Sequence, residues 1–256
     1  MEGDRVIELG ASSLAAWLVV GGGDVGEHPL ADVRLVAPVP RPPSVRDFYA
    51  FERHVRSTRA QRGLEMAPEW YQLPVFYFSN PAAVNGPEDE IVFPPESSAW
   101  DYELEAAAVV GAGGRIAGFT VMNDWSARDL QKMEMAVGLG PAKGKDFDGA
   151  NAFGPCIVTA DEIPDPYDLP MIVRVNGEER SRGSSREMHW QFEDVIAYVS
   201  QGETLRPGEI LGSGTVGDGC GLEHLRFLED GDRVELEIPP IGVLANRVTR
   251  TAPAAA

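Results

Sequence analysis

Short apolar runs broken by glycine and proline dominate this chain, and such a pattern predicts strands more often than helices. In the first forty residues we expect small strands at three of these runs, Val6–Ile7, Leu18–Val20 and Val33–Val36. The proline-rich stretch Pro38–Pro43 then interrupts regular structure. We therefore expect a small N-terminal β segment over residues 1–40 and a main domain over residues 41–256.

Helical periodicity is limited to three later stretches. Ser44 is a suitable N-cap for a helix that ends by Gly63, with apolar residues at helical spacing. On that helix Asp47 and His54 would share one face. A second helix is expected from Asp124, where Arg128 and Gln131 continue one polar stripe. A third is expected at Phe192–Val199.

The remaining patterns are those of paired strands. Trp70–Phe78 and Ile91–Phe93 are aromatic or β-branched runs. Two hairpins are expected, one joining Tyr102–Val110 to Ile116–Met122, and one turning at Asn176–Gly177, a pair suited to a type I′ turn. The sequence thus predicts an α+β fold that is mainly β and largely antiparallel, with a few peripheral helices.

Two Glu-x-Glu strands differ in what surrounds their carboxylates. Glu235 and Glu237 alternate with apolar residues only, which is typical of a strand with one face in water. Glu103 and Glu105 instead lie on a face that begins at Asp101 and continues into apolar residues. A strand that is apolar on both faces is buried, so these carboxylates need a positive partner. A divalent cation is one such partner, and ion pairs with Arg128 or Lys145 are the other.

Composition limits the classes of partner. The 256 residues include 22 basic and 40 acidic side chains, giving a formal net charge of −18, so nucleic acid and anionic membranes would be repelled. Cys156 and Cys220 are too far apart in sequence for a disulfide framework or a CxxC site. The first residues lack a basic leader, and no apolar run is long enough to span a membrane. We expect a cytoplasmic protein.

Several motifs together resemble one known family. They are Glu103-Leu-Glu105, the string Met122-Asn-Asp-Trp-Ser-Ala-Arg-Asp-Leu-Gln-Lys132, Gly144-Lys145, and Leu211-Gly-Ser-Gly-Thr-Val216. Over roughly residues 40–250 the chain is similar to the fumarylacetoacetate hydrolase family. This resemblance implies a mixed β-roll or β-sandwich, a homodimer, and a divalent cation, Mg²⁺ first and Mn²⁺ or Ca²⁺ as alternatives.

The resemblance also implies roles for individual residues. Glu103, Glu105 and Asp124 match the metal ligands, and Asp47 matches a further aspartate of the eukaryotic enzyme. His54 resembles its general base and Glu223 the glutamate that orients this base. Groups that steady the oxyanion and the leaving carbanion are matched by Arg128, Gln131 and Lys145, and substrate-contacting groups by Tyr49, Tyr77 and Thr215.

Some positions depart from that family's eukaryotic enzyme. Met135 stands where that enzyme has a substrate-binding tyrosine, and Ser57 occupies the position at which the acylpyruvase branch has a glutamate. These differences leave the substrate's acyl group open.

The function expected from the sequence is a metal-dependent hydrolase that cleaves a carbon-carbon bond in a small, anionic acylpyruvate-like or 1,3-diketo acid. His54 would activate water, and the metal would stabilise the departing enolate. The alternatives are an oxaloacetate decarboxylase or a dienoate isomerase or hydratase of the same family. A non-catalytic, metal-stabilised binding protein is the alternative from another class.

Overall fold

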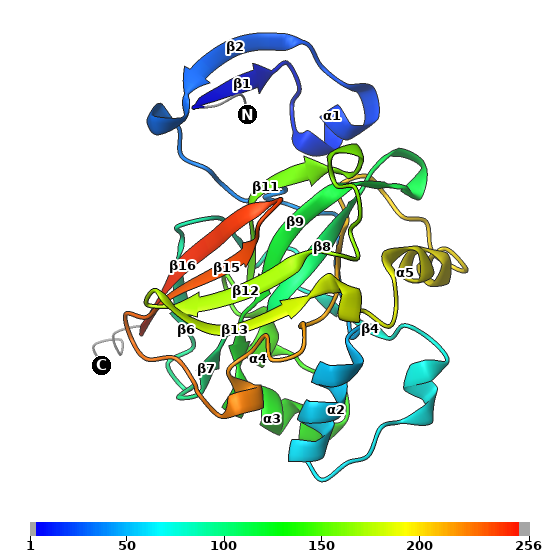
Figure 1. Cartoon of the computed structure of the whole chain (residues 1–256), viewed down its shortest axis with the longest axis vertical. Coiled ribbons are helices and arrows are strands. Elements are labelled where there is room, and N and C mark those ends of the chain that lie inside the picture. Colours follow the sequence, from blue (N-terminus) through cyan, green and yellow to red (C-terminus); the bar gives the residue numbers. More distant parts are fainter. Residues whose placement is uncertain (1–3, 251–256) are drawn as a thin grey trace.

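The computed structural model describes residues 4–250 and contains two large β-sheets with helices at their ends and edges (Figure 1). The strands are β1 Arg5–Leu9, β2 Asp24–Pro29, β3 Val45–Phe48, β4 Phe76–Ser79, β5 Val84–Asn85, β6 Glu90–Phe93, β7 Trp100–Asp101, β8 Leu104–Val110, β9 Ile116–Asp124, β10 Ser126–Ala127, β11 Asn151–Thr159, β12 Pro170–Val175, β13 Glu178–Ser184, β14 Ile210–Gly212, β15 Arg233–Ile238 and β16 Gly242–Arg250. The α-helices are α1 Leu14–Val20, α2 Glu52–Gln61, α3 Arg128–Val137, α4 Lys143–Asp146 and α5 Phe192–Val199.

The strand order confirms a mainly antiparallel β fold. One sheet has the order β4-β3-β14-β8-β9-β11-β5 and the other β13-β12-β15-β16-β6. Within them the pairs β3·β14, β5·β11 and β6·β16 are parallel, and the other pairs are antiparallel. The sheets pack on each other where β8 and β9 meet β12, β15 and β16 (Figure 1). The buried side chains between them form the main hydrophobic core.

Burial along two strands confirms the contrast between the two Glu-x-Glu segments. All seven residues of β8 are buried, because β9 and β14 flank this strand and β12 lies against it. In β15, Val234, Leu236 and Ile238 are buried, while Glu235 and Glu237 are partly exposed. The carboxylates of Glu103 and Glu105 therefore lie in the interior.

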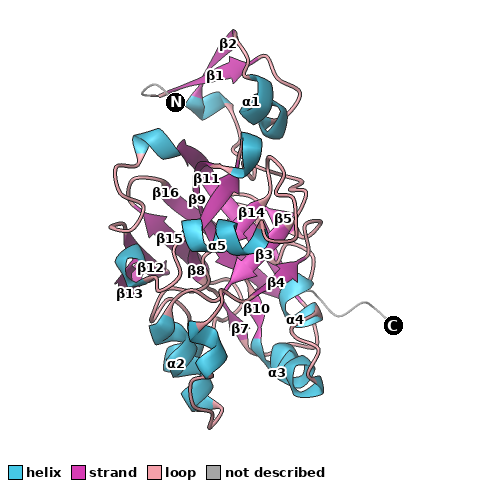
Figure 2. Cartoon of the chain, turned by 90° about the vertical axis from the view of Figure 1, so that its right-hand side faces the viewer, coloured by secondary structure: helices cyan, strands magenta, loops and turns pink. Residues whose placement is uncertain are grey.

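The N-terminal segment contains a helix where the sequence pattern predicts a strand. Leu14–Val20 forms α1, and the Ser13 hydroxyl accepts a hydrogen bond from the Ala16 N–H as its N-cap. Leu14 and Leu18, one helical turn apart, pack against the core of the main sheet. β1 and β2, which α1 separates in sequence, pair as a two-stranded antiparallel sheet of their own at one end of the molecule (Figure 2). Val33–Val36 belongs to no strand. The prediction of strands at Leu18–Val20 and Val33–Val36 is thus wrong, and the boundary at residue 40 stays a prediction.

The helix predicted from residue 45 begins later, at Glu52. Val45–Phe48 is instead strand β3, and all four of its residues are buried. Its partners β14 and β4 lie far away in sequence, and their hydrogen bonds decide its conformation. Asp47 therefore lies on a strand and His54 on the following helix. The prediction that the two residues share one face of a single helix is wrong.

Two more boundaries differ from the predicted ones. Pro68–Tyr71 forms a 3-10 helix, and of the run Trp70–Phe78 only the last three residues lie in a strand, β4. The helix expected from Asp124 starts at Arg128, because β9 extends through Asp124 and Ser126–Ala127 pairs with β7. The hairpin at Asn176–Gly177 is confirmed, with both residues at positive φ.

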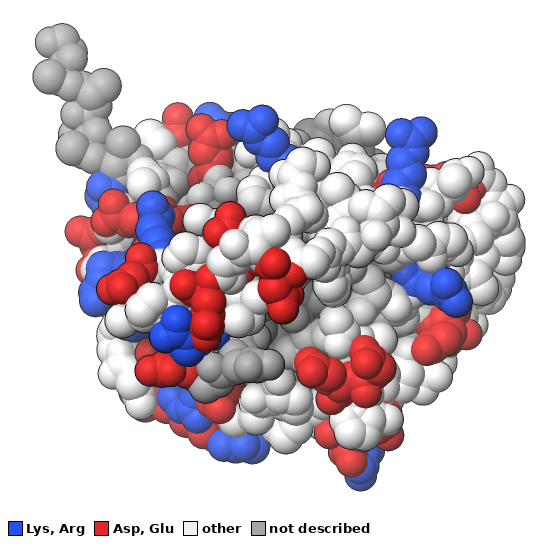
Figure 3. Space-filling model, turned by 90° about the horizontal axis from the view of Figure 1, so that it is seen from above, with Lys and Arg blue, Asp and Glu red and all other residues white. Residues whose placement is uncertain are grey.

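The outer surface carries both signs of charge. On the face in Figure 3, acidic and basic side chains are interspersed, and among the described residues no continuous basic patch is seen there. Within residues 4–250, no helix is long and apolar enough to cross a membrane. The homodimer, the cytoplasmic location and the lack of nucleic-acid partners stay predictions.

Candidate active site

Four buried carboxylates meet at one end of the large sheet. Asp47 lies on β3, Glu103 just before β8, Glu105 on β8, and Asp124 at the end of β9. Each offers an oxygen that lies within 4.8 Å of the others. Since β3, β14, β8 and β9 are neighbours in the sheet, residues from distant parts of the sequence converge here. The structure thus brings together all four predicted metal ligands, and their role stays a prediction.

Both positive partners considered for this strand reach the carboxylates. The Lys145 ammonium group, carried by α4, donates to Glu103 Oε2 and lies 2.5 Å from Asp124 Oδ2. Arg128, the first residue of α3, donates from Nη2 to Glu103 Oε1 at 2.7 Å. Arg128 also pairs with Asp101, so two cations face five carboxylates. The site keeps an excess of negative charge.

That excess appears in the pKa values. Burial, reinforced by neighbouring carboxylates, raises the pKa of Asp47 and of Glu105 well above the ordinary range. Burial also raises the pKa of Asp124, to about 6, although Lys145 opposes the shift. Burial works against ionisation of Glu103 as well, but Arg128, Lys145 and His54 hold its pKa well below the usual range. Without a further cation, the site therefore favours bound protons.

The unpaired oxygens of the cluster fit a divalent cation. Within the described residues, Asp47 Oδ1, Glu105 Oε1 and Asp124 Oδ1 are buried without a hydrogen-bond partner. Buried acceptors left unpaired are costly, and a cation would satisfy them. Four carboxylates form an all-oxygen donor set, which suits hard ions such as Mg²⁺, Mn²⁺ or Ca²⁺.

Gly212 on β14 gives the cluster its space. A Cβ added at this position would lie 2.8 Å from Glu105 Oε2 and 3.1 Å from Asp47 Oδ1. We expect Gly212→Ala to push these oxygens aside and to weaken Mn²⁺ binding at least about tenfold, as measured by isothermal titration calorimetry. Gly202→Ala, where a Cβ meets nothing within 4 Å, is the matched control. Equal Mn²⁺ affinity in the two variants would contradict this view of the site.

A histidine and a glutamate stand beside the carboxylates. His54 on α2 is buried, whereas His28, His189 and His224 are exposed. Its Nδ1 lies 3.2 Å from Glu223 Oε2, and its Nε2 lies 4.0 Å from Glu103 Oε1. An ionised carboxylate only accepts hydrogen bonds, so Glu223 assigns the proton to Nδ1 and leaves Nε2 as a base. Although burial opposes it, the hydrogen bond with His54 keeps the pKa of Glu223 below its ordinary range.

The other predicted residues lie around this centre. Gln131 Oε1 accepts from Arg128 Nη1 at 3.1 Å, and the Tyr77 hydroxyl donates to Asp124 Oδ2 at 2.7 Å. The Tyr49 ring meets the His54 ring edge to face, with centroids 5.7 Å apart. Thr215 is buried in the loop whose Gly214 N–H donates to Glu105 Oε2. Their proposed contacts with a substrate stay predictions.

Two residues of the site were not identified from the sequence as functional. Cys220 Sγ is 3.5 Å from Glu223 Oε2 and 4.0 Å from His54 Nδ1, and nothing in its local sequence indicates this. Asp101 pairs with Arg128. Strand alternation did place Asp101 on the same face as Glu103, so a signal for its burial was present.

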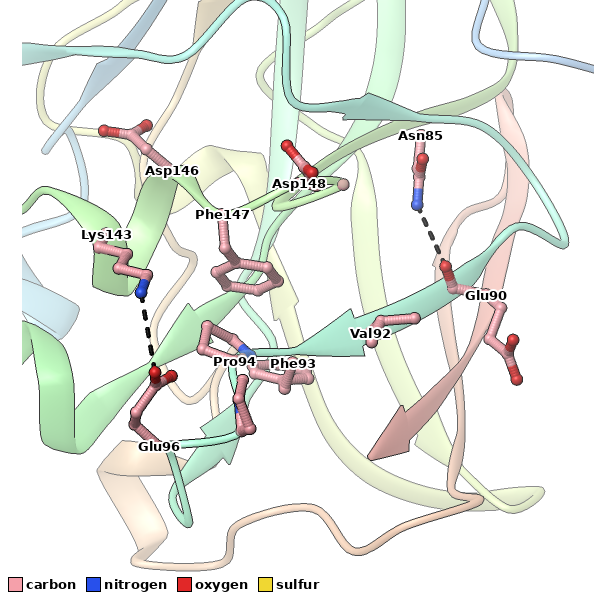
Figure 4. A pocket seen from close by; sticks show the side chains of 12 residues that line it. Asn85, Glu90, Val92, Phe93, Pro94, Glu96, Lys143, Asp146, Phe147 and Asp148 are labelled. Atoms are coloured by element: carbon pink, nitrogen blue, oxygen red, sulfur yellow. Dashed lines mark hydrogen bonds and ion pairs between the residues drawn. The ribbon is translucent and has the colours of Figure 1, made fainter. Parts of the chain in front are cut away.

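A separate surface pocket of about 710 Å³ lies beside α4 (Figure 4). Lys143 and Glu96 face each other at its edge, 4.0 Å apart, and Phe147 and Pro94 point into it. None of the predicted site residues lines this pocket. It is therefore distinct from the carboxylate cluster, although α4 contributes to both.

Comparisons with known proteins agree with this geometry. Residues 44–249 match the family model described as fumarylacetoacetate (FAA) hydrolase C-terminal. The human mitochondrial oxaloacetate tautomerase FAHD2A is 34% identical over 258 residues, which cover 96% of this chain and 77% of that protein. The oxaloacetate tautomerase YisK of Bacillus subtilis is 32% identical, with 96% and 84% covered. The structure of 5-carboxymethyl-2-hydroxymuconate delta-isomerase from Mycobacterium smegmatis matches with a TM-score of 0.79 at 29% identity, covering 98% of this chain and 93% of that one. The chain belongs to the fumarylacetoacetate hydrolase family.

Proposed function

We propose that this enzyme moves a proton at the carbon next to the keto group of a small 2-oxo dicarboxylic acid, interconverting the keto and enol forms of oxaloacetate or a close analogue. The observation that carries the proposal is the His54–Glu223 pair, whose free Nε2 faces the carboxylate cluster. A positioned base beside a cation site is what proton abstraction next to a carbonyl requires.

The side chains have distinct tasks in this reaction. His54 takes the proton from carbon, and the electron pair of the broken C–H bond moves toward the carbonyl oxygen. Glu223 stabilises the imidazolium that forms, because its carboxylate holds Nδ1–H. Return of a proton to the oxygen completes the enol. A divalent cation held by Asp47, Glu103, Glu105 and Asp124, Mg²⁺ in our proposal, would supply positive charge for the oxygen on which negative charge develops.

Arg128, Lys145 and Gln131 supply the remaining polar groups. Arg128 on α3 and Lys145 on α4 both reach Glu103, and Gln131 accepts a hydrogen bond from Arg128. These side chains therefore border the carboxylate cluster that His54 Nε2 faces. Fixed donors aimed at a developing oxyanion are worth roughly 2 to 4 kcal/mol each in other enzymes. The names of the two tautomerase relatives, which align over 96% of this chain, support oxaloacetate as the substrate class.

Carbon-carbon bond hydrolysis is the second candidate. The same base can take its proton from water instead of carbon, and the family model is named after such a hydrolase. Cleavage would need water placed for attack on a carbonyl carbon, followed by departure of an enolate. The two reactions share the buried base and differ in what it deprotonates.

The test follows both reactions in one set of assays. We expect purified protein with Mg²⁺ to speed the loss of enol absorbance of oxaloacetate, with the product still a four-carbon acid by NMR. Two organic fragments from an acylpyruvate would favour hydrolysis, and released CO₂ would favour decarboxylation. Thermal stabilisation by Mg²⁺ without turnover of any oxo or diketo acid would contradict the proposal and favour a binding protein.

A further inference from the structure

Asp101 is a buried carboxylate, and both of its oxygens accept hydrogen bonds from protein donors. It ends β7 and is 0% exposed. Oδ1 accepts from the Tyr102 and Gly221 N–H groups at 2.9 and 2.7 Å. Oδ2 accepts from Arg128 Nε at 2.7 Å and from the Leu222 N–H at 2.9 Å. Four donors require an ionised, acceptor-only group, and they leave its oxygens no free site for a cation.

The hydrogen-bond partners of Asp101 contact two parts of the site, the carboxylate cluster and the His54–Glu223 pair. Arg128 continues to Glu103 and Gln131, on the side of the carboxylate cluster. Gly221 and Leu222 begin the 3-10 turn Leu222–His224, which carries Glu223 and therefore holds His54. The Asp101 carboxylate thus connects Arg128, beside the carboxylate cluster, to the backbone of the turn that carries Glu223.

The turn is packed closely enough for this link to fix its place. A Cβ on Gly221 would lie 2.7 Å from Asp101 Oδ1 and 2.3 Å from the Arg226 carbonyl oxygen. Just before it, Cys220 forms a β-bridge with Glu103, and its Sγ lies 3.5 Å from Glu223 Oε2. Gln61 of α2 and the Asp218 backbone also hold this turn, and Asp101 supplies the anchor that connects it to Arg128.

We propose that Asp101 is a positioning residue that locks Arg128 and the Glu223 turn into one unit, so that the base keeps its place relative to the carboxylate cluster. Asp101 differs from Asp47 and Glu105, whose side chains keep an unpaired oxygen for a ligand. The kinetic part of this inference rests on the proposed function, whereas its structural part does not.

The first test is Asp101→Asn. An amide puts an NH₂ group against two N–H donors, so at least two of the four hydrogen bonds are lost. A displacement of the base of about 1 Å can cost roughly 10²-fold in rate. We expect kcat to fall about 10- to 100-fold, with KM and the Mg²⁺ concentration for half-activation changed less than about threefold. An unchanged kcat would overturn the proposal.

The matched control is Glu209→Gln. Glu209 is 5% exposed and accepts from Arg46 Nη1 at 2.9 Å, so it is also a buried carboxylate paired with an arginine. It makes no contact with His54 or Glu223 in the described structure. We expect a comparable loss of thermal stability in both variants but a fall in kcat only in Asp101→Asn. Equal falls in kcat would mean that general destabilisation is responsible.

A double-mutant cycle separates positioning from a general loss of structure. If Asp101 acts through Glu223, Asp101→Asn should lower kcat less than about threefold when Glu223→Gln is already present. Full multiplication of the two single effects would overturn the proposed route. Where Asp101→Asn does not fold, Asp101→Ser, which is smaller and leaves space for water, is used in the same cycle.

Amide hydrogen exchange tests the structural part of the inference without an enzyme assay. Peptides covering residues 220–224 should exchange faster in Asp101→Asn than in wild type, and at the wild-type rate in Glu209→Gln. This result is expected even if the enzyme acts on none of the oxo acids, so failure of the proposed function and failure of this inference are distinguishable. Unchanged exchange in Asp101→Asn would overturn the inference.

Discussion

Replacing His54 with asparagine is expected to lower kcat about 10²- to 10⁴-fold without loss of metal binding. The asparagine amide can replace Nδ1 as the donor to Glu223 Oε2, so the buried carboxylate keeps a partner. It has no group at the position of Nε2, which faces Glu103, and so nothing there accepts the proton. The variant removes the base and preserves its surroundings.

The measurement is kcat at saturating oxo acid, together with Mn²⁺ affinity by calorimetry. His189→Asn is the control, because His189 is exposed and its ring packs against those of Trp70, Tyr71 and Trp190, none of which belongs to the carboxylate cluster. If His54→Asn kept more than about a third of the wild-type kcat, another group would have to be the base.

The burial of Glu103 and Glu105 could be predicted because its signal is local. Alternation along residues 101–110 shows both faces of one strand, so a carboxylate on an otherwise apolar strand is visible without any partner strand. The solvent-facing Glu235 and Glu237 served as an internal comparison, and burial confirms the difference.

The strand that carries Asp47 could not be predicted for the opposite reason. Phe48, Phe51 and Val55 recur at helical spacing, and only the pairing of β3 with β14 and β4 decides against a helix there. Leu14–Val20 shows the converse, since an apolar run without alternation suits a strand or a short capped helix equally well.

The proton-transfer half depended on contacts between distant parts of the chain. No local pattern links Glu223 to His54, and the resemblance to a family supplied that pairing before the structure showed it at 3.2 Å. Strand alternation places Asp101 on the same face as Glu103 but indicates no partner for it. Its ion pair with Arg128 and its bonds to the Gly221 turn require three-dimensional structure.

Glu105→Gln is expected to stabilise the metal-free protein and to weaken the stabilisation that Mg²⁺ gives. Burial and the neighbouring Asp47 and Asp124 raise the pKa of Glu105 well above its ordinary value of 4.5. The folded state therefore binds a proton at this carboxyl more tightly than the unfolded chain does. This contribution to stability is fully present below about pH 4.5 and is lost as the pH rises toward the folded-state pKa.

Glutamine has no such proton to lose. In EDTA at pH 7, the variant should therefore be more stable than wild type by up to about 3 kcal/mol, since each pH unit above the unfolded pKa costs about 1.4 kcal/mol. Near pH 4 the two should melt alike. With Mg²⁺ at 100 times its Kd, wild type should gain about 2.7 kcal/mol, and the variant, which has lost a charged ligand, should gain little.

Calorimetric melting from pH 4 to 8, with EDTA and with Mg²⁺, tests all of these expectations together. Glu235→Gln is the control, because it makes the same change in the partly exposed Glu-x-Glu strand β15 and should shift neither the pH dependence nor the response to Mg²⁺. A metal-free Glu105→Gln protein less stable than wild type at pH 7 would mean that a charged Glu105 is well compensated by Lys145 and Arg128. The carboxylate cluster would then be an ion-pair network that stabilises the sheet, rather than a binding site for a divalent cation.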